Sequence, residues 1–204
     1  MKNISLKKLM LALLLTAAVP TLTAQVHVGD ILCEGNAIIS PANYPSSGAT
    51  AIGVVFYVDN TGQHGWAVAL EDAGEYAWGG YGSANAPLPH YNYTRQAVYD
   101  LDGYENTRIV REHNAAHPAF YAVDFESGWY VPSIGQLNYL FGNLVEVNAS
   151  LREVAGNQFT NGWEYWSSTM YSDNYAWSLK SSGELNTYVT ATNYSRGVRA
   201  VRNF

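Results

Sequence analysis

Cysteine is almost absent from this sequence, which excludes a framework of disulfides. The 204 residues include a single cysteine, Cys33. A lone thiol cannot form a disulfide within the chain, so the fold must be held by its hydrophobic core. Lipid attachment at Cys33 is disfavoured because Leu32 stands where such a signal needs a small residue. The favoured interpretation is a buried structural cysteine.

Long hydrophobic runs are absent beyond the first 24 residues. There, three lysines precede the apolar run Leu9–Val19, and the small residues of Thr21–Ala24 precede an expected cleavage at Gln25. The run is shorter than the roughly 20 apolar residues that span a bilayer, although a retained anchor is the alternative. We therefore predict a signal peptide at 1–24 and a single exported domain at 25–204, without a transmembrane segment after cleavage.

Charged residues are scarce, at 14% of the chain, and the balance is acidic. Removing the three lysines of the signal peptide from the formal charge of −6 leaves −9. An acidic surface argues against nucleic acid or an anionic membrane as a partner. The 16 tyrosines are typical of an extracellular, β-rich protein with a polar, aromatic surface.

The first half of the chain shows a hairpin pattern followed by a helical pattern. Ile52–Val58 and Trp66–Asp72 are apolar runs separated by turn residues, which predicts a β-hairpin. Gly74–Tyr93 is rich in Gly, Pro and aromatics and is predicted to be a long surface loop. Gln96–Phe125 is predicted to be mostly helical, with a break at Pro118.

The second half begins with a clear helix start. Ser133 can cap a helix and Gln136 can complete a capping box, after which apolar residues follow at helical spacing. A second helix is expected after a break near Gly142. From Trp163 onward the period changes to two, which predicts four short strands, the last being "GVRAVR". This order predicts an α+β fold rather than repeated βαβ units.

Several of these segments resemble one known family. They are "DGYENTRIV", "GWYVPSIGQLNYL", "YWSST", "YAWSL" and "RGVRAVRNF", which lie in this order between about Asp102 and Arg202. The set is similar to the bacterial Lcl C-terminal-like domains, whose recurring pattern is Asp-Gly-x-x-Asn-Thr, Trp-x-x-Pro-(Ser/Thr)-x-x-(Glu/Gln)-Leu, Tyr-Trp-Ser-Ser and Val-Arg-x-Val-Arg. Many members carry paired cysteines, whereas this chain has Ala122 roughly where one of them is expected.

The resemblance implies a C-type-lectin-like fold, with two main helices packed on short twisted antiparallel sheets. It also implies an exported protein used for adhesion or ligand display, and it carries no agreed catalytic residues. Formylglycine-generating oxidases share that general fold but use a pair of cysteines, which one cysteine cannot supply.

The motif residues divide into an expected core and an expected recognition surface. Trp129, Pro132, Leu137, Trp166 and Trp177 are predicted to be buried, and the Ser167–Thr169 hydroxyls to bond to nearby backbone. The polar, tyrosine-rich turns that follow suit ligand recognition, because Tyr gives a rigid contact area with a polar tip. The candidate ligand-binding residues are Tyr171, Asp173, Asn174, Tyr175, Asn186, Tyr188, Asn193 and Tyr194. The alternative is that these are ordinary polar turns.

Metal and catalytic sites are disfavoured by the residue pattern. The histidines are scattered. His113 and His117 are four residues apart, but the break at Pro118 prevents them from sharing one helix face. No Glu-Pro-Asn, Gln-Pro-Asp or Trp-Asn-Asp motif of calcium-dependent lectins is present. Five carboxylates could serve a glycosidase, but their spacing singles out no acid and nucleophile; they are Asp100, Asp102, Glu105, Asp124 and Glu126. Asp102 and Asn106 are expected to hold a turn and a helix start through bonds to backbone.

These observations predict a non-catalytic recognition domain, secreted or displayed on the bacterial surface, that binds a glycan or a protein through its C-terminal loops without metal or cofactor. The first alternative is a structural subunit of a surface fibre or pilus-like appendage. A second is a retroelement target whose segment Gln158–Arg196 is hypermutated at adenine-rich codons, and a third is a hydrolase.

Overall fold

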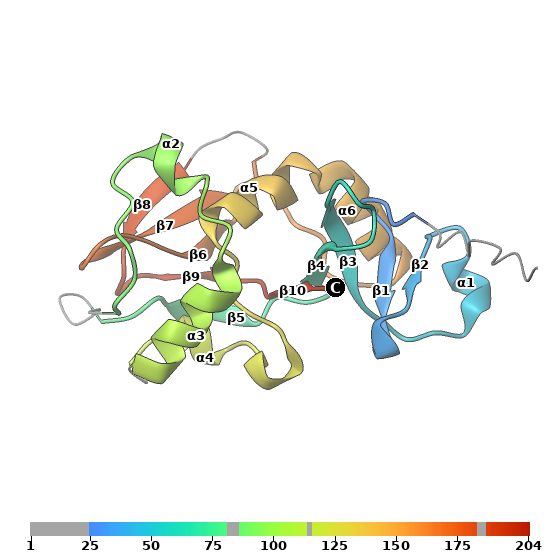
Figure 1. Cartoon of the computed structure of the whole chain (residues 1–204), viewed down its shortest axis with the longest axis horizontal. Coiled ribbons are helices and arrows are strands. Elements are labelled where there is room, and N and C mark those ends of the chain that lie inside the picture. Colours follow the sequence, from blue (N-terminus) through green and yellow to red (C-terminus); the bar gives the residue numbers. More distant parts are fainter. Residues whose placement is uncertain (1–24, 81–85, 114–115, 183–186) are drawn as a thin grey trace, which may run out of the picture.

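Two five-stranded sheets form the framework of the molecule (Figure 1). The computed structural model describes residues 25–80, 86–113, 116–182 and 187–204, and for 187–191 the backbone alone. The predicted signal peptide lies outside the described residues. No helix within those ranges is long and apolar enough to cross a membrane.

The strands and helices have the following bounds. The first sheet has the order β10-β4-β3-β1-β2, with β1 at Ile31–Cys33, β2 at Ile38–Ile39, β3 at Ala51–Val58, β4 at Gly65–Ala69 and β10 at Val201–Asn203. The second sheet has the order β5-β9-β6-β7-β8, with β5 at Gly74–Ala77, β6 at Glu164–Ser172, β7 at Tyr175–Lys180, β8 at Thr187–Ala191 and β9 at Ser195–Val198. The α-helices are α1 (Tyr44–Ser47), α2 (Thr94–Ala97), α3 (Gly103–His113), α4 (Pro118–Tyr121), α5 (Ile134–Gly142) and α6 (Leu144–Glu153), and short 3-10 helices span Glu34–Asn36 and Phe125–Ser127.

The predicted α+β class is confirmed, and so are its main local features. β3 and β4 pair antiparallel as the expected hairpin. The helical region is divided, as expected, by a helix that begins at Pro118. Ser133 accepts a hydrogen bond from the Gln136 backbone while the Gln136 side chain accepts one from the Ser133 backbone, which is the predicted capping box. α6 follows directly after Gly142 as the second helix.

Three predictions about the sheets were wrong. Gly74–Tyr93 is not simply a surface loop, because it contains β5, which forms an edge of the second sheet. Trp78, the residue that follows β5, is fully buried. The closing "GVRAVR" is not one strand, since β9 pairs with β5 while β10 pairs with β4 in the other sheet. The expectation of purely antiparallel pairing also fails at Tyr165, which faces Gly197 in a parallel arrangement.

The apolar core lies on both sides of α5, which contacts β3 of the first sheet and β6 and β7 of the second. Leu137, Trp166 and Trp177 are buried as predicted, whereas Trp129 is only half-buried. Cys33 is buried, as expected, and this burial raises the pKa of its thiol.

A buried carboxylate, Asp100, joins the sequence motifs that lie far apart along the chain. Its Oδ2 accepts hydrogen bonds from the hydroxyl of Thr169 at 2.6 Å and from the amide of Asn106 at 3.0 Å. Its Oδ1 accepts the backbone N–H of Asp102, and its carbonyl accepts the hydroxyl of Ser133. The side chain of Asn106 therefore bonds to another side chain and not, as expected, to the backbone. The segments that contain Asn106, Ser133 and Thr169 meet at one polar centre around Asp100.

Candidate functional site

Four of the eight predicted recognition residues lie in two adjacent turns at one end of the second sheet. Asp173 and Asn174 form the turn between β6 and β7. Asn193 and Tyr194 lie in the turn between β8 and β9. The backbone N–H of Thr192 donates to the carbonyl of Asn174 at 3.0 Å, which ties the two turns together.

The first turn presents some of its predicted side chains and packs others. Asp173 is exposed and lies 3.3 Å from Nε2 of His90, while Tyr175 is also exposed. Tyr171 is partly buried and packs edge-on against Trp177, with ring centroids 5.7 Å apart. Tyr171 thus supports the turn by packing against Trp177, and only its exposed part is open to a ligand.

In the second turn, Tyr194 has 58% of its surface exposed and lies beside the guanidinium of Arg196, 5.8 Å from its ring centroid. Asn193 is exposed next to it. Of the remaining predicted residues, Asn186 lies outside the described residues, and only the backbone of Tyr188 is described.

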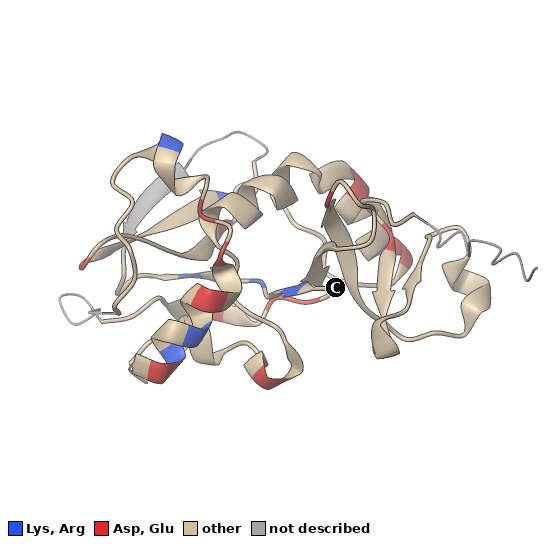
Figure 2. Cartoon of the chain, viewed as in Figure 1, with Lys and Arg blue, Asp and Glu red and all other residues tan. Residues whose placement is uncertain are grey.

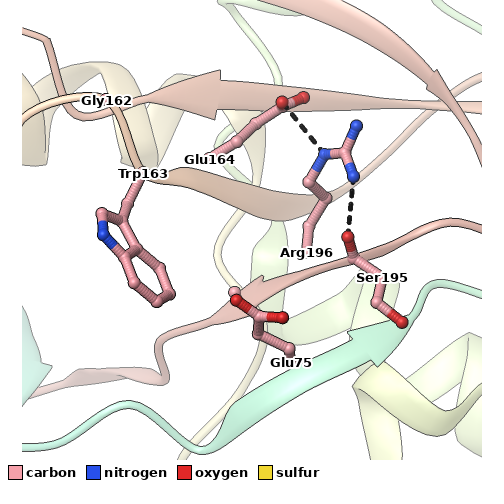
Figure 3. Close-up of a pocket in the computed structure, with 7 residues that line it drawn as sticks. Glu75, Gly162, Trp163, Glu164, Ser195 and Arg196 are labelled. Atoms are coloured by element: carbon pink, nitrogen blue, oxygen red, sulfur yellow. Dashed lines mark hydrogen bonds and ion pairs between the residues drawn. The ribbon is translucent and has the colours of Figure 1, made fainter.

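A groove of about 370 Å³ opens next to this turn, between β5, β9 and the start of β6 (Figure 3). Its lining includes the exposed ring of Trp163, the exposed carboxylate of Glu75, and Arg196. Figure 3 shows these three side chains around a common space, with Glu164 joined to the guanidinium by a dashed line that marks their ion pair. We call this the Trp163 groove.

An ion-pair network holds the guanidinium in the Trp163 groove. Nε of Arg196 lies 3.0 Å from Oε2 of Glu164, and Nη1 donates to the carbonyl of Ser195 at 2.7 Å. The other carboxylate oxygen of Glu164 accepts the hydroxyl of Ser178 at 2.5 Å. Because both ends of the pair are anchored, Arg196 is oriented before any ligand arrives.

The local sequence explains why there is a groove here. Gly162 has a φ of +91°, a left-handed conformation that suits glycine, and it turns the chain just before Trp163. Gly197 crosses the ring of Tyr165, and a Cβ at this position would lie 3.0 Å from that ring. Without a side chain at Gly197, β9 can lie close to β6 beneath the groove.

The arrangement supplies the contacts that a polar ring-shaped ligand needs. An exposed indole offers an apolar face, Glu75 offers acceptors, and Arg196 offers donors at a fixed position. The volume falls within the range of about 300–1,000 Å³ that is usual for small-ligand sites. Trp163, Glu75 and Arg196 were not among the residues predicted from the sequence. Of the three, only Arg196 had a local signal, because it stands two positions after Tyr194 at the end of a polar turn.

The five carboxylates considered for glycoside hydrolysis do not all meet at one place, although Asp102 and Glu105 line one cavity. Asp100 is buried in its polar centre, and Asp124 accepts the backbone N–H of Ser127. Glu105 is held by Arg108 at 2.6 Å on the surface of α3. Among the described residues no group of three or more His, Cys, Asp or Glu side chains is placed to hold a metal ion. His117 is buried against Trp78, with ring centroids 5.3 Å apart.

Comparisons with known proteins find a solved structure with a similar fold. No family model and no curated protein matches the chain. A fimbrial protein from Bacteroides ovatus has a similar structure, with a TM-score of 0.66 over 88% of this chain at 16% sequence identity. The match covers 49% of the fimbrial protein, so this chain spans about half its length. The shared fold is thus a mixed α+β arrangement, and the assignments to the Lcl family and to the C-type-lectin-like fold stay predictions.

Proposed function

We propose that this chain is a non-catalytic recognition domain of a surface-displayed protein, and that it binds a glycan in the Trp163 groove. The observation that carries the proposal is the exposed indole of Trp163 beside the anchored guanidinium of Arg196 and the carboxylate of Glu75. Sugars present apolar ring faces and many hydroxyls, which match an aromatic surface flanked by fixed donors and acceptors.

The two turns, with Asp173, Asn193 and Tyr194, and the adjoining Tyr175 at the start of β7 would extend the contact beyond the groove. Tyr194 lies on the groove side of these turns because its ring is next to Arg196. A longer glycan would therefore lie across the groove and over Tyr194. The core beneath, with Trp166 and Trp177 buried, keeps both surfaces rigid.

A glycan array probed with the purified protein tests this proposal. We expect binding to a restricted set of glycans, weakened more than tenfold by Trp163→Ala or Tyr194→Ala, since truncating an aromatic hot spot costs about 2 kcal/mol or more. The matched control is Tyr99→Ala, because Tyr99 is 81% exposed but lies outside the groove. Absence of any glycan signal, or full binding by Trp163→Ala, would refute the proposal.

The second candidate function is a structural subunit of a surface fibre. The similar structure favours it, because that protein is a fimbrial protein. This alternative predicts polymers that form as concentration rises, visible by electron microscopy, and that are unaffected by Trp163→Ala. Monomers at all concentrations together with a glycan signal would favour recognition over assembly.

A further inference from the structure

A second cavity, of about 380 Å³, lies away from the Trp163 groove, between the start of α3 and the first sheet. Its lining includes Trp66, Asp102, Tyr104, Glu105, Tyr130 and Asn203. We call it the Trp66 cavity. It combines three aromatic side chains with two carboxylates, and none of the proposed glycan contacts belongs to it.

The aromatic side chains that line the Trp66 cavity are held in place by contacts with other aromatic rings. Trp66 is stacked on Tyr57, with ring centroids 4.3 Å apart. Tyr104 is stacked on Phe125 at 5.0 Å and meets Tyr130 edge-on at 5.7 Å. Rings fixed in this way need little ordering when a ligand enters, which favours binding.

The position of Tyr130 is also fixed by hydrogen bonds. Its hydroxyl donates to Oδ1 of Asn203 at 2.6 Å and accepts the side-chain N–H of Gln136 at 2.9 Å. Asn203 is thereby fixed at the mouth of the cavity, at the end of β10. Four separate segments of the chain thus build one rigid cavity: β4, the start of α3, Tyr130 and β10.

The charge of the Trp66 cavity is negative. Asp102 and Glu105 are the charged residues among those described in its lining. Glu105 is neutralised by Arg108, whereas no hydrogen bond to the carboxylate of Asp102 comes from any described residue. Figure 2 shows acidic positions in the segment that leads into α3 and in the first turn of α3. The pKa of the nearby Tyr91 is raised, first by burial and then by the charges of Asp100 and Asp102.

We propose that the Trp66 cavity binds an organic cation, namely an alkylammonium group. Aromatic rings attract ammonium groups through their electron-rich faces, and the effect grows where water is displaced. Asp102 supplies the negative charge that balances the bound cation. An anionic ligand is disfavoured because it would be repelled by the carboxylates of Asp102 and Glu105. The group could belong to a free quaternary amine such as choline or to a lysine side chain, and the two sources share this chemistry.

A nuclear magnetic resonance titration of the purified, nitrogen-15-labelled protein tests the proposal. With choline as the probe, we expect saturable shifts of the Trp66 indole N–H and of the backbone amides around Asp102. The uncharged isostere 3,3-dimethylbutan-1-ol should bind at least about tenfold more weakly, because it lacks the charge. N-acetyl-lysine methylamide forms the second arm, and whichever cation binds more tightly identifies the source.

Two variants locate the site. Asp102→Asn removes the charge without removing a hydrogen bond of the fold, and it should weaken choline binding at least fivefold. Tyr104→Leu should have a similar effect, since Tyr104 is 43% exposed and its loss removes one aromatic wall. The matched control Glu75→Gln lies in the Trp163 groove and should leave choline binding unchanged. Equal binding of the alcohol, unchanged affinity in Asp102→Asn, or no saturable shift with either cation would overturn the proposal, whatever the glycan array shows.

Discussion

The hydroxyl of Thr169 on β6 donates a 2.6 Å hydrogen bond to the buried carboxylate of Asp100. The same hydroxyl oxygen accepts the backbone N–H of Ile134 at 2.9 Å, at the first residue of α5. One side chain therefore links the second sheet to the helix that lies between the two sheets, and its loss affects two buried polar groups at once.

Replacing Thr169 by Val should destabilise the protein by about 2–3 kcal/mol, because it leaves a buried carboxylate and a buried N–H with one partner fewer. Urea denaturation monitored by circular dichroism measures this change. Thr61→Val is the matched control, since Thr61 donates a 2.6 Å bond to Asp59 in an exposed turn. It should change the midpoint little, and an equal loss in both variants would contradict the prediction.

The stability of the fold should fall at alkaline pH because of Tyr130 and Tyr165. Burial raises the pKa of both hydroxyls well above their usual value of 10.0. In the unfolded chain these groups ionise near pH 10, whereas in the folded chain they stay protonated. Their contribution is therefore complete below pH 10 and is lost as the pH rises above it.

The loss for each buried tyrosine approaches about 1.4 kcal/mol per pH unit above pH 10. Thermal unfolding measured between pH 8 and pH 11 should show this decline, and Tyr130→Phe should make it shallower while lowering stability at neutral pH through its lost hydrogen bonds. The exposed Tyr99 provides the control, because Tyr99→Phe should leave the decline unchanged. If the stability of the unsubstituted protein did not change between pH 8 and pH 11, the attribution of the decline to the buried tyrosines would be refuted.

Two glycines at opposite ends of α5 should respond to alanine in opposite directions. A Cβ on Gly135 would lie 2.4 Å from the carbonyl oxygen of Asp100, so Gly135→Ala must displace backbone and should cost about 2 kcal/mol or more. A Cβ on Gly142 would meet nothing within 4 Å, and Gly142→Ala should stabilise the protein by up to about 1 kcal/mol. Denaturation midpoints of the two variants provide the comparison, and a shift in the same direction would contradict the geometry.

The ion pair between Arg199 and Asp72 should contribute more to stability than the pairs on α3. Arg199 is buried, lies 2.9 Å from Asp72, donates to the carbonyl of Asn157 and has its guanidinium 4.6 Å from the ring centroid of Phe159. Burial lowers the pKa of Arg199, which shows that its charge is costly to keep there.

Asp72→Asn should therefore cost about 2 kcal/mol, somewhat below the 3–5 kcal/mol seen for fully buried pairs, because Asp72 is 29% exposed. The control is Arg108→Gln, which breaks exposed pairs with Glu105 and Glu112 and should alter the unfolding midpoint little. Guanidinium chloride would screen these charges, so urea is the denaturant to use. A larger effect of Arg108→Gln than of Asp72→Asn would overturn this ranking.

Local signals in the sequence predicted those features that depend on neighbouring residues. The capping box of Ser133 and Gln136 and the β3–β4 hairpin were confirmed because each is built within a short stretch of chain. β5 was missed because it is short, starts at a glycine and has β9 as its only neighbour among the described strands. The sequence cannot show that partner, since it is far away in the chain.

The same reason explains what could be foreseen of the candidate site. The turns that contain Asp173 and Tyr194 were recognisable from their composition. The Trp163 groove was not, because Glu75 approaches Arg196 only through the pairing in which Tyr76 lies opposite Arg196. Likewise, strand-like sequence continues from Val198 through Ala200 into Val201 without a turn residue, so it does not mark the point where the chain leaves one sheet for the other.

That crossing has a mechanical consequence. β9 and β10 follow one another with only Arg199 and Ala200 between them, so the extended backbone from Arg196 to Phe204 runs through both sheets. A pull on the carboxyl end loads β10 first and is transmitted along this run to the guanidinium beside Trp163. If a glycan binds in the Trp163 groove as proposed, its retention under flow and the resistance of the domain to stretching would depend on the same few residues.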